Sequence, residues 1–168
     1  GAIVVNDTCE SSVPGVYAVG DVNGGPQFTY ISLDDFRIVF GALTGNGHYT
    51  LKDRKNIPYT TFLTPPLARV GLTEEDAINK GYTVKTKEML VATMPRAHVN
   101  DNLKGAFKIV VDAESNLILG ATLYSQGAEE LINMIKVAMD NNIPYTYFKN
   151  QIFTHPTMAE NLNDLCNF

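Results

Sequence analysis

The chain has 168 residues, 45% of them hydrophobic and 18% charged, which is typical of a globular protein and excludes wholesale disorder. Its 13 basic and 18 acidic residues give a net charge of -5, and the basic residues do not cluster, so no nucleic acid or anionic membrane is expected as a partner. The longest apolar runs, such as 2–5 and 117–119, fall far short of the ~20 residues that a membrane-spanning helix needs.

The two cysteines, Cys9 and Cys166, lie at opposite ends of the chain and form neither a CxxC pair nor a metal-ligand spacing. This pattern fits a reducing compartment, and we expect a cytoplasmic protein. Residue 1 is Gly, and an apolar segment starts at once. Such a start is typical of a chain cut from a longer protein.

The first third of the chain predicts few elements. Short strands are expected at Ala2–Val5 and Val16–Val19, the second ending at Gly20-Asp21. A helix is expected over Thr29–Leu43, with Ile31, Phe36, Val39, Phe40 and Leu43 as its apolar stripe. Two short strands and one helix cannot close a core, so residues 1–50 are interpreted as the end of a domain whose front is missing.

The rest of the chain, residues 51–168, predicts an α+β domain with an antiparallel sheet and helices on one side. Extended segments are expected at Pro58–Leu63, Leu67–Gly71 and Tyr82–Val91, and a hairpin at Ala106–Val111 and Leu117–Leu123. Helices are expected from Thr73 to Lys80, over 128–139, after Pro144 and over Ala159–Leu165.

Gly20-Asp21 is the first candidate site. Ligands of open α/β sheets bind at the carboxyl ends of strands, where a glycine permits close approach and a carboxylate accepts bonds from hydroxyl groups. The alternative is a simple turn without function.

His155 and Glu160 form the second candidate site. Histidine moves protons near neutral pH, and a carboxylate on one ring nitrogen makes the other more basic. Pro156 forces a bend between the two residues, which allows their side chains to meet. The alternative is that Thr157-x-x-Glu160 is a capping box of the last helix, and both interpretations hold together if Glu160 uses its two oxygens separately.

Three further groups of residues are weaker candidates. Met94 and His98 are soft ligands that suit copper, although an exposed loop is the simpler interpretation. Asp34-Asp35 and Glu129-Glu130 are adjacent acids, which point apart on a helix and are interpreted as solvated faces.

Three ordered motifs resemble the pyridine nucleotide-disulfide oxidoreductases, the family of glutathione reductase, dihydrolipoamide dehydrogenase and mercuric reductase. Residues 16–21 (VYAVGD) are similar to the second FAD-binding motif, and residues 62–74 to the start of the carboxyl-terminal dimerisation domain. Residues 154–160 are similar to the active-site His-Pro-Thr-x-x-Glu. The resemblance covers essentially the whole chain, and residues 30–35 look like the mercuric-reductase-like branch linked to reactive chlorine resistance.

The resemblance implies that residues 1–50 are the remnant of an FAD-binding domain plus a connector helix, and that residues 51–168 are the dimerisation domain. Asp21 would bind the ribityl–pyrophosphate part of FAD, Gly20 would permit close approach, and a backbone N–H of Thr29 would lie near the flavin. His155 would serve as acid/base in the active site of a second copy of the chain, with Glu160 orienting it.

No GxGxxG motif and no Cys-x4-Cys pair occur in these residues. We therefore expect the parent protein to use FAD and NAD(P)H through segments missing here, and the isolated chain to be inactive without a bound cofactor. Mercury is a doubtful substrate, because only Cys166 stands where mercuric reductases usually carry two adjacent cysteines. The alternatives are a non-catalytic dimerisation module and a small copper-binding protein.

Overall fold

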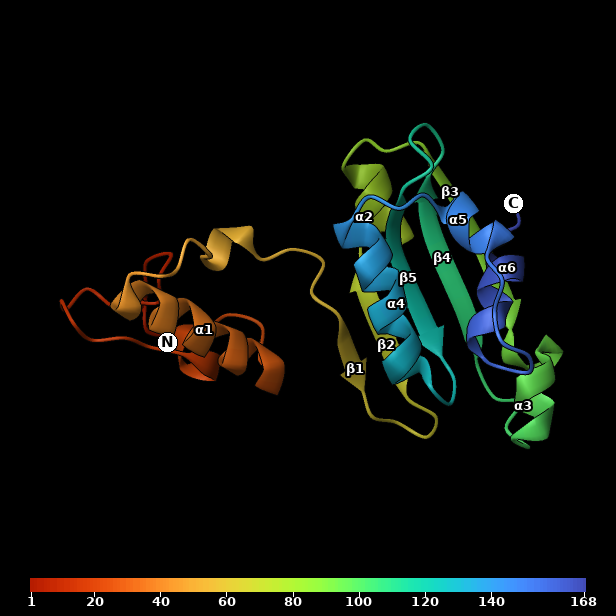
Figure 1. Ribbon diagram of the computed structural model, residues 1–168, viewed down its shortest axis with the longest axis horizontal. Coiled ribbons are helices and arrows are strands. Elements are labelled where there is room, and N and C mark those ends of the chain that lie inside the picture. The colour runs from red at the N-terminus through yellow and green to blue at the C-terminus, as the bar shows by residue number, and fades with distance from the viewer. The chain divides into compact units, whose positions relative to one another are not determined.

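Figure 1 presents a computed structural model that describes residues 1–168. The chain divides into two compact units, Gly1–Lys55 and Asn56–Phe168, here called the N-terminal and the C-terminal unit. None of the helices is both long enough and apolar enough to span a bilayer.

The N-terminal unit contains one long helix, α1 (Thr29–Thr44), and the short 3-10 helices η1 (Gly20–Asn23) and η2 (Leu51–Asp53). Helix α1 confirms the prediction, and it ends at Gly45, whose left-handed backbone lets its N–H donate to the carbonyl of Gly41. The two predicted strands are wrong. Only the isolated bridges Val5–Ser11 and Glu10–Tyr17 form, because neither segment has a neighbouring strand in this chain to extend a ladder.

The stripe predicted for α1 is confirmed at Ile31 and wrong at most of its other positions. Phe36, Phe40 and Leu43 are exposed, whereas the buried positions are Ile31, Asp35 and Ile38. These three residues follow the spacing of one helix face. The helix therefore buries a face that includes an acid, and it leaves an aromatic face uncovered within this unit.

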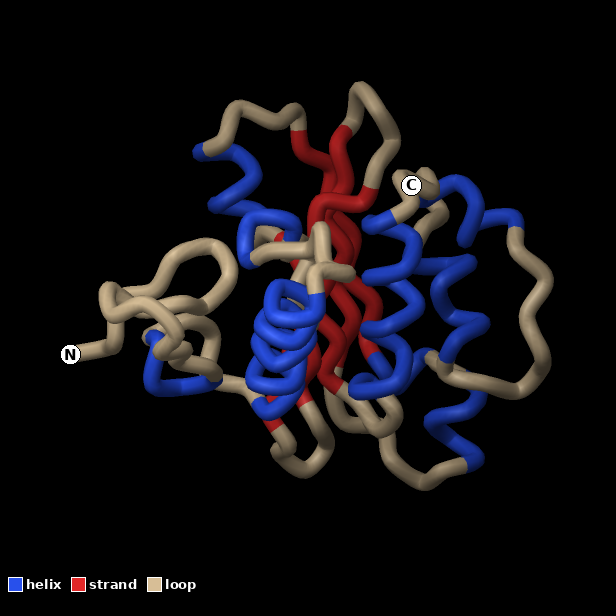
Figure 2. The backbone as a smooth tube through the Cα atoms, turned by 60° about the vertical axis from the view of Figure 1, so that its left-hand side comes forward, coloured by secondary structure: helices blue, strands red, loops and turns tan.

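The C-terminal unit is built on a five-stranded sheet in the order β1-β2-β5-β4-β3, with every neighbouring pair antiparallel. Figure 2 shows the strands gathered in one central layer. The strands are β1 (Tyr59–Thr61), β2 (Leu67–Gly71), β3 (Val84–Leu90), β4 (Ala106–Asp112) and β5 (Ile118–Tyr124). The predicted hairpin is confirmed as β4–β5.

The helices of this unit are short except for α4. They are α2 (Glu74–Asn79), α3 (Pro95–Val99), α4 (Ala128–Asp140), α5 (Tyr145–Asn150) and α6 (Leu162–Leu165), with 3-10 turns η3 (Val91–Thr93) and η4 (Ala159–Asn161). Helix α2 begins at the predicted cap, where the Thr73 hydroxyl accepts from the Asp76 N–H at 3.0 Å. The predicted last helix is a 3-10 turn followed by α6.

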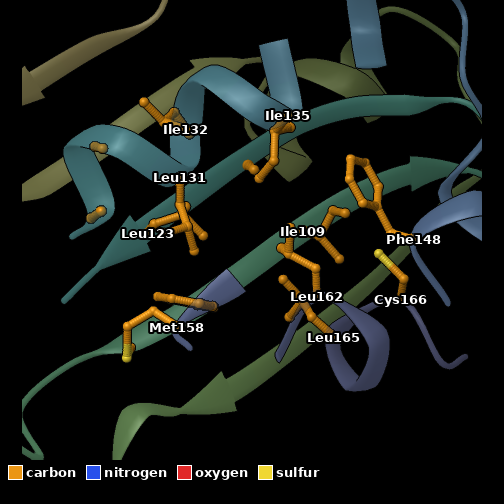
Figure 3. Packing of buried hydrophobic residues seen from close by; sticks show 14 of the residues in the cluster. Ile109, Leu123, Leu131, Ile132, Ile135, Phe148, Met158, Leu162, Leu165 and Cys166 are labelled. Carbon is orange, nitrogen blue, oxygen red and sulfur yellow. The ribbon is translucent and has the colours of Figure 1, made fainter. Parts of the chain in front are cut away.

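One hydrophobic core joins the sheet to α4, α5 and α6 (Figure 3). Alternate residues of a strand share a face of the sheet. On the face that forms this core, Phe107, Ile109 and Val111 of β4 are fully buried. Helix α4 packs against β5 and β2 with a stripe of side chains, and α6 packs against β4. The buried residues of the α4 stripe include Leu131, Ile132, Ile135 and Ala138. Each large side chain buried here stabilises the fold by about 1.5–3 kcal/mol. This core fixes α5 and α6, and it thereby fixes both ends of the segment that carries His155.

Candidate functional site

The cluster around His155 lies between α5 and α6. The Nδ1 atom of His155 is 2.8 Å from Glu160 Oε2, across a bend that contains the cis bond to Pro156. The imidazole is 71% exposed, whereas the Glu160 side chain is only 17% exposed. An ionised carboxylate only accepts hydrogen bonds, so Nδ1 is the donor and the neutral ring keeps its lone pair on Nε2. The pair thus presents a proton acceptor to the surface.

The capping box forms at the same residues. The Glu160 N–H donates to the Thr157 hydroxyl oxygen at 3.1 Å, and the Thr157 N–H reaches Glu160 Oε1 at 3.4 Å. Glu160 therefore uses one oxygen for the imidazole and the other for the turn. The two interpretations of this segment that the sequence left open hold together.

Two asparagines hold the segment at its ends. Asn163 donates from Nδ2 to the carbonyl oxygens of Phe148 (2.6 Å) and Gln151 (3.0 Å), which ties the end of α5 to α6. The buried Asn161 donates to the carbonyl oxygens of Thr157 and Met158, both at 3.1 Å. The backbone on both sides of His155 is therefore fixed although its ring is exposed.

A lysine from the sheet fastens the end of the chain. Lys87 of β3 donates from Nζ to the carbonyl oxygens of Asp164 and Asn167, at 2.7 and 2.6 Å. A cation at these carbonyls complements the negative end of α6. No sequence pattern indicated this contact, because the partners are about 80 residues apart.

Gly20 and Asp21 begin η1 in the N-terminal unit. Gly20 has a φ of +73°, a backbone conformation that favours glycine, and a Cβ there would lie 2.6 Å from Ser32 Oγ and displace that hydroxyl. Asp21 is exposed, and its carboxylate makes no hydrogen bond or ion pair within the chain. The turn that the sequence allowed is therefore present, and it displays an unpaired carboxylate.

Thr29 is the first residue of α1. The preceding Phe28 provides no side-chain cap, and the first turn contains no acid. The N–H groups of Thr29 and Tyr30 make no backbone hydrogen bond. Uncapped N–H groups at the positive end of a 16-residue helix suit an anionic or acceptor group.

The interpretation of Asp34-Asp35 as a solvated face is wrong. Asp35 is 0% exposed, and Arg54 binds both acids, with Nη2 2.6 Å from Asp35 Oδ1 and Nε 2.8 Å from Asp34 Oδ2. Asp35 sits four residues after Ile31 and three before Ile38, on the buried face of α1. That spacing was the available signal, and it was missed because the stripe was assigned to other residues. Glu130 is exposed, but Oε2 of Glu129 is buried without a partner.

The segment around Met94 and His98 is a short helix and not an exposed loop. Pro95 occupies its first turn, and Met94 is fully buried in the core. His98 is exposed, with Nε2 2.8 Å from the carbonyl oxygen of Ala92. The thioether is therefore withheld from any surface ligand set. No group of three or more His, Cys, Asp or Glu side chains in the chain is arranged to hold a metal ion.

Both thiols are free and buried. Loss of hydration raises the pKa of Cys9 to about 11 and that of Cys166 to about 12. Because the thiolate is the nucleophile, neither residue is an activated redox cysteine. Cys9 and Cys166 are therefore not the pair of cysteines that a disulfide reductase would oxidise and reduce.

Comparison with known proteins identifies the family. Residues 57–166 match the family model described as pyridine nucleotide-disulphide oxidoreductase, dimerisation domain. The chain belongs to this family. It is 48% identical over 165 residues to the probable pyridine nucleotide-disulfide oxidoreductase RclA of Escherichia coli, with 98% of this chain and 37% of that protein covered.

Other relatives are more distant. The mercuric reductase of Lysinibacillus sphaericus is 36% identical over 160 residues, covering 95% of this chain and 29% of that protein. The dihydrolipoyl dehydrogenase of Chlorobaculum tepidum is 32% identical over 164 residues, covering 98% of this chain and 35% of that protein. The chain thus spans about a third of the length of these relatives.

The solved structures agree with the fold. A structure described as the HOCl-induced flavoprotein disulfide reductase RclA from Escherichia coli has a TM-score of 0.95 at 47% identity, covering 99% of this chain and 38% of that one. LpdA from Mycobacterium tuberculosis has a TM-score of 0.86 at 22% identity, which supports the fold alone. The predicted family, its reactive-chlorine branch and the α+β fold are confirmed.

Proposed function

We propose that the chain is the carboxyl-terminal part of a homodimeric, FAD-dependent NAD(P)H:disulfide oxidoreductase. In this proposal the dimerisation domain carries His155 into the active site of the partner subunit. The observation that carries the proposal is the exposed imidazole whose Nδ1 is held by Glu160 while Nε2 remains available. Membership of the dimerisation-domain family supports the partner, and the flavoprotein relative supports the cofactor.

The imidazole moves a proton during dithiol–disulfide exchange. A thiolate attacks a disulfide sulfur, and the thiol that leaves has to be protonated. Nε2 of His155 takes a proton from the incoming thiol and returns it to the leaving one. Glu160 keeps the ring in this tautomer and stabilises the positive charge that the ring gains.

The N-terminal unit fits part of an FAD site. Gly20 offers a backbone without Cβ, Asp21 an exposed carboxylate for hydroxyl groups of the ribityl chain, and Thr29 an uncapped N–H at the start of α1. The chemistry that bound FAD would supply at this site is the transfer of two electrons between NAD(P)H and the disulfide. The remaining binding groups and the redox cysteines belong, in this proposal, to further segments of the parent chain, so the isolated chain is inactive.

Replacing His155 in the full-length parent protein tests the acid/base role. We expect His155→Ala to slow disulfide turnover by ~10²–10⁴-fold, the usual contribution of general acid–base catalysis, and to leave the reduction of flavin by NAD(P)H intact. The control is His98→Ala, which removes an exposed histidine of the same unit that lies outside the cluster. An unchanged turnover in His155→Ala removes this residue from the mechanism.

Mixed dimers test whether the imidazole acts across the interface. A His155→Ala subunit is paired with a subunit that lacks its redox cysteines, and each homodimer is inactive. If the histidine serves the partner, the mixed dimer regains one intact site and turns over disulfide. If it serves its own subunit, the mixture stays inactive. A parent that binds no flavin and reduces no disulfide instead supports the alternative, a non-catalytic dimerisation module.

A further inference from the structure

A buried carboxylate connects α1 to the turn that carries Asp21. Oδ2 of Asp35 accepts from the Gly20 N–H at 2.7 Å and from Asn23 Nδ2 at 2.8 Å. Gly20 and Asn23 are the first and last residues of η1, and Asp21 lies between them. One oxygen of a side chain in the middle of α1 therefore holds both ends of this turn.

The other oxygen of Asp35 is neutralised from elsewhere. Arg54 contacts Oδ1 at 2.6 Å, and its side chain is only 10% exposed. Burial opposes the charge of this guanidinium, but hydrogen bonds and charge contacts with Asp35 and Asp34 outweigh it and raise the pKa of Arg54. A buried carboxylate is unfavourable unless it is paired and hydrogen-bonded, and here both conditions are met.

The same helix presents the other proposed flavin contact. Thr29 lies at the start of α1, and Ser32 Oγ occupies the space that a Cβ of Gly20 would need. The position of the Asp21 turn relative to the helix start is thus held by the polar contact at Asp35, and Ser32 of the same helix lies next to Gly20. Loss of the polar contact would leave the buried Gly20 N–H without an acceptor, and it would leave Asn23 Nδ2 with only the carbonyl oxygen of Ala18 at 3.3 Å.

We propose that Asp35 is a positioning residue for FAD, acting by holding the η1 turn so that Asp21 and the start of α1 face the same ligand. The inference builds on the proposed function. Asp35 itself touches no cofactor in this proposal, and its effect passes through Gly20 and Asn23. Removing it therefore weakens FAD binding without removing any group that binds FAD.

The neighbouring acid supplies a matched control. Asp34→Ala and Asp35→Ala make the same change of charge on the same helix, and each removes one contact with Arg54. Only Asp35 reaches η1. We expect Asp35→Ala to weaken FAD binding by about 10–100-fold, the range of one to two lost bonds to a charged acceptor, and Asp34→Ala to change it by less than about 3-fold.

The measurements use the full-length parent protein, stripped of flavin and titrated with FAD. The visible circular dichroism of the bound flavin reports its surroundings, and urea unfolding of the flavin-free protein reports stability. We expect an altered flavin spectrum in Asp35→Ala alone. Equal losses of FAD affinity in Asp34→Ala and Asp35→Ala overturn the inference. In that case the affinity depends on the ion pairs with Arg54 and not on the bonds from Asp35 to η1.

A second variant covers the case in which Asp35→Ala fails to fold. Asn23→Ala leaves the pair of Asp35 and Arg54 in place and removes one of the two bonds between Asp35 and η1, together with the bonds of Asn23 to Ala18 and Gly25. We expect about 3–10-fold weaker FAD binding with unfolding by urea close to wild type; unchanged FAD binding refutes the inference. If the wild-type parent binds FAD and both variants bind it with unchanged affinity, the inference about Asp35 is wrong but the proposed function stands. A wild-type parent that binds no FAD overturns the proposed function as well.

Discussion

Three histidines in different surroundings make the orienting role of Glu160 measurable in this chain. The carboxylate requires Nδ1 of His155 to donate, so the neutral ring carries its proton there. At His98 the acceptor is the carbonyl oxygen of Ala92, which requires Nε2 to donate. His48 is exposed and makes no hydrogen bond. The two bonded rings should therefore show opposite tautomers, with His48 as the unbiased reference.

The perturbation is Glu160→Ala. Because the ring of His155 is 71% exposed, solvent screens the pair, and its contribution is about 0.5–1 kcal/mol. That energy corresponds to a bias of roughly 2–5-fold in the tautomer ratio. Ring nitrogen chemical shifts of the ¹⁵N-labelled chain, recorded at alkaline pH where imidazole is neutral, report the ratio directly. We expect the ratio at His155 to move towards that of His48, while His98 stays unchanged.

Thr157→Ala provides the control for the second function of Glu160. It removes the hydroxyl group that accepts from the Glu160 N–H but leaves the carboxylate that holds the imidazole. The tautomer ratio at His155 should then stay close to wild type. An identical ratio in wild type and Glu160→Ala refutes the reasoning, since the carboxylate would not orient the ring.

Three further predictions concern stability. Gly120→Ala places a Cβ 2.1 Å from the carbonyl oxygen of Leu72 and should cost about 3 kcal/mol or more in urea unfolding, whereas Gly81→Ala meets no atom and should cost about 1–2 kcal/mol through its positive φ. Burial raises the pKa of Cys166 from 9.0 to about 12, so the folded chain keeps the thiol proton to a higher pH than the unfolded chain does. The contribution of this thiol to the free energy of unfolding is therefore complete below pH 9. It is lost between pH 9 and about 12, by at most ~1.4 kcal/mol per pH unit. Stability measured at pH 8 and pH 10 should therefore fall further in wild type than in Cys166→Ala. Lys87→Met removes two bonds to the end of the chain and should cost ~1–2 kcal/mol, with faster hydrogen exchange confined to α6; exchange that is unchanged there contradicts the contact.

Local signals were enough to predict most of the C-terminal unit. The cap at Thr73, the turn between β4 and β5 and the apolar stripe of α4 each lie within a few residues of the element that they specify. The bend at Pro156 was equally local, and it allowed the contact between His155 and Glu160 that the structure contains. In these cases, local preference and final packing agree.

The N-terminal unit was predicted less well because its structure depends on distant partners. The segments at 2–5 and 16–19 have the composition of strands but lack neighbours to pair with in this chain. Asp35 was misassigned because its partners Gly20 and Arg54 lie 15 and 19 residues away, and no short pattern connects them. The buried face of α1 was missed for a different reason: the spacing of Ile31, Asp35 and Ile38 is local, but the aromatic residues formed the more conspicuous stripe.

Glu160 connects the orientation of the His155 imidazole to the turn that precedes the last helix. The same side chain closes the turn that leads into α6 and accepts from the imidazole, each with a different oxygen. A glutamine has a single acceptor oxygen, so it could serve the turn or the imidazole but would not replace both oxygens. Natural variation at this position should therefore be narrower than catalysis or folding alone would demand.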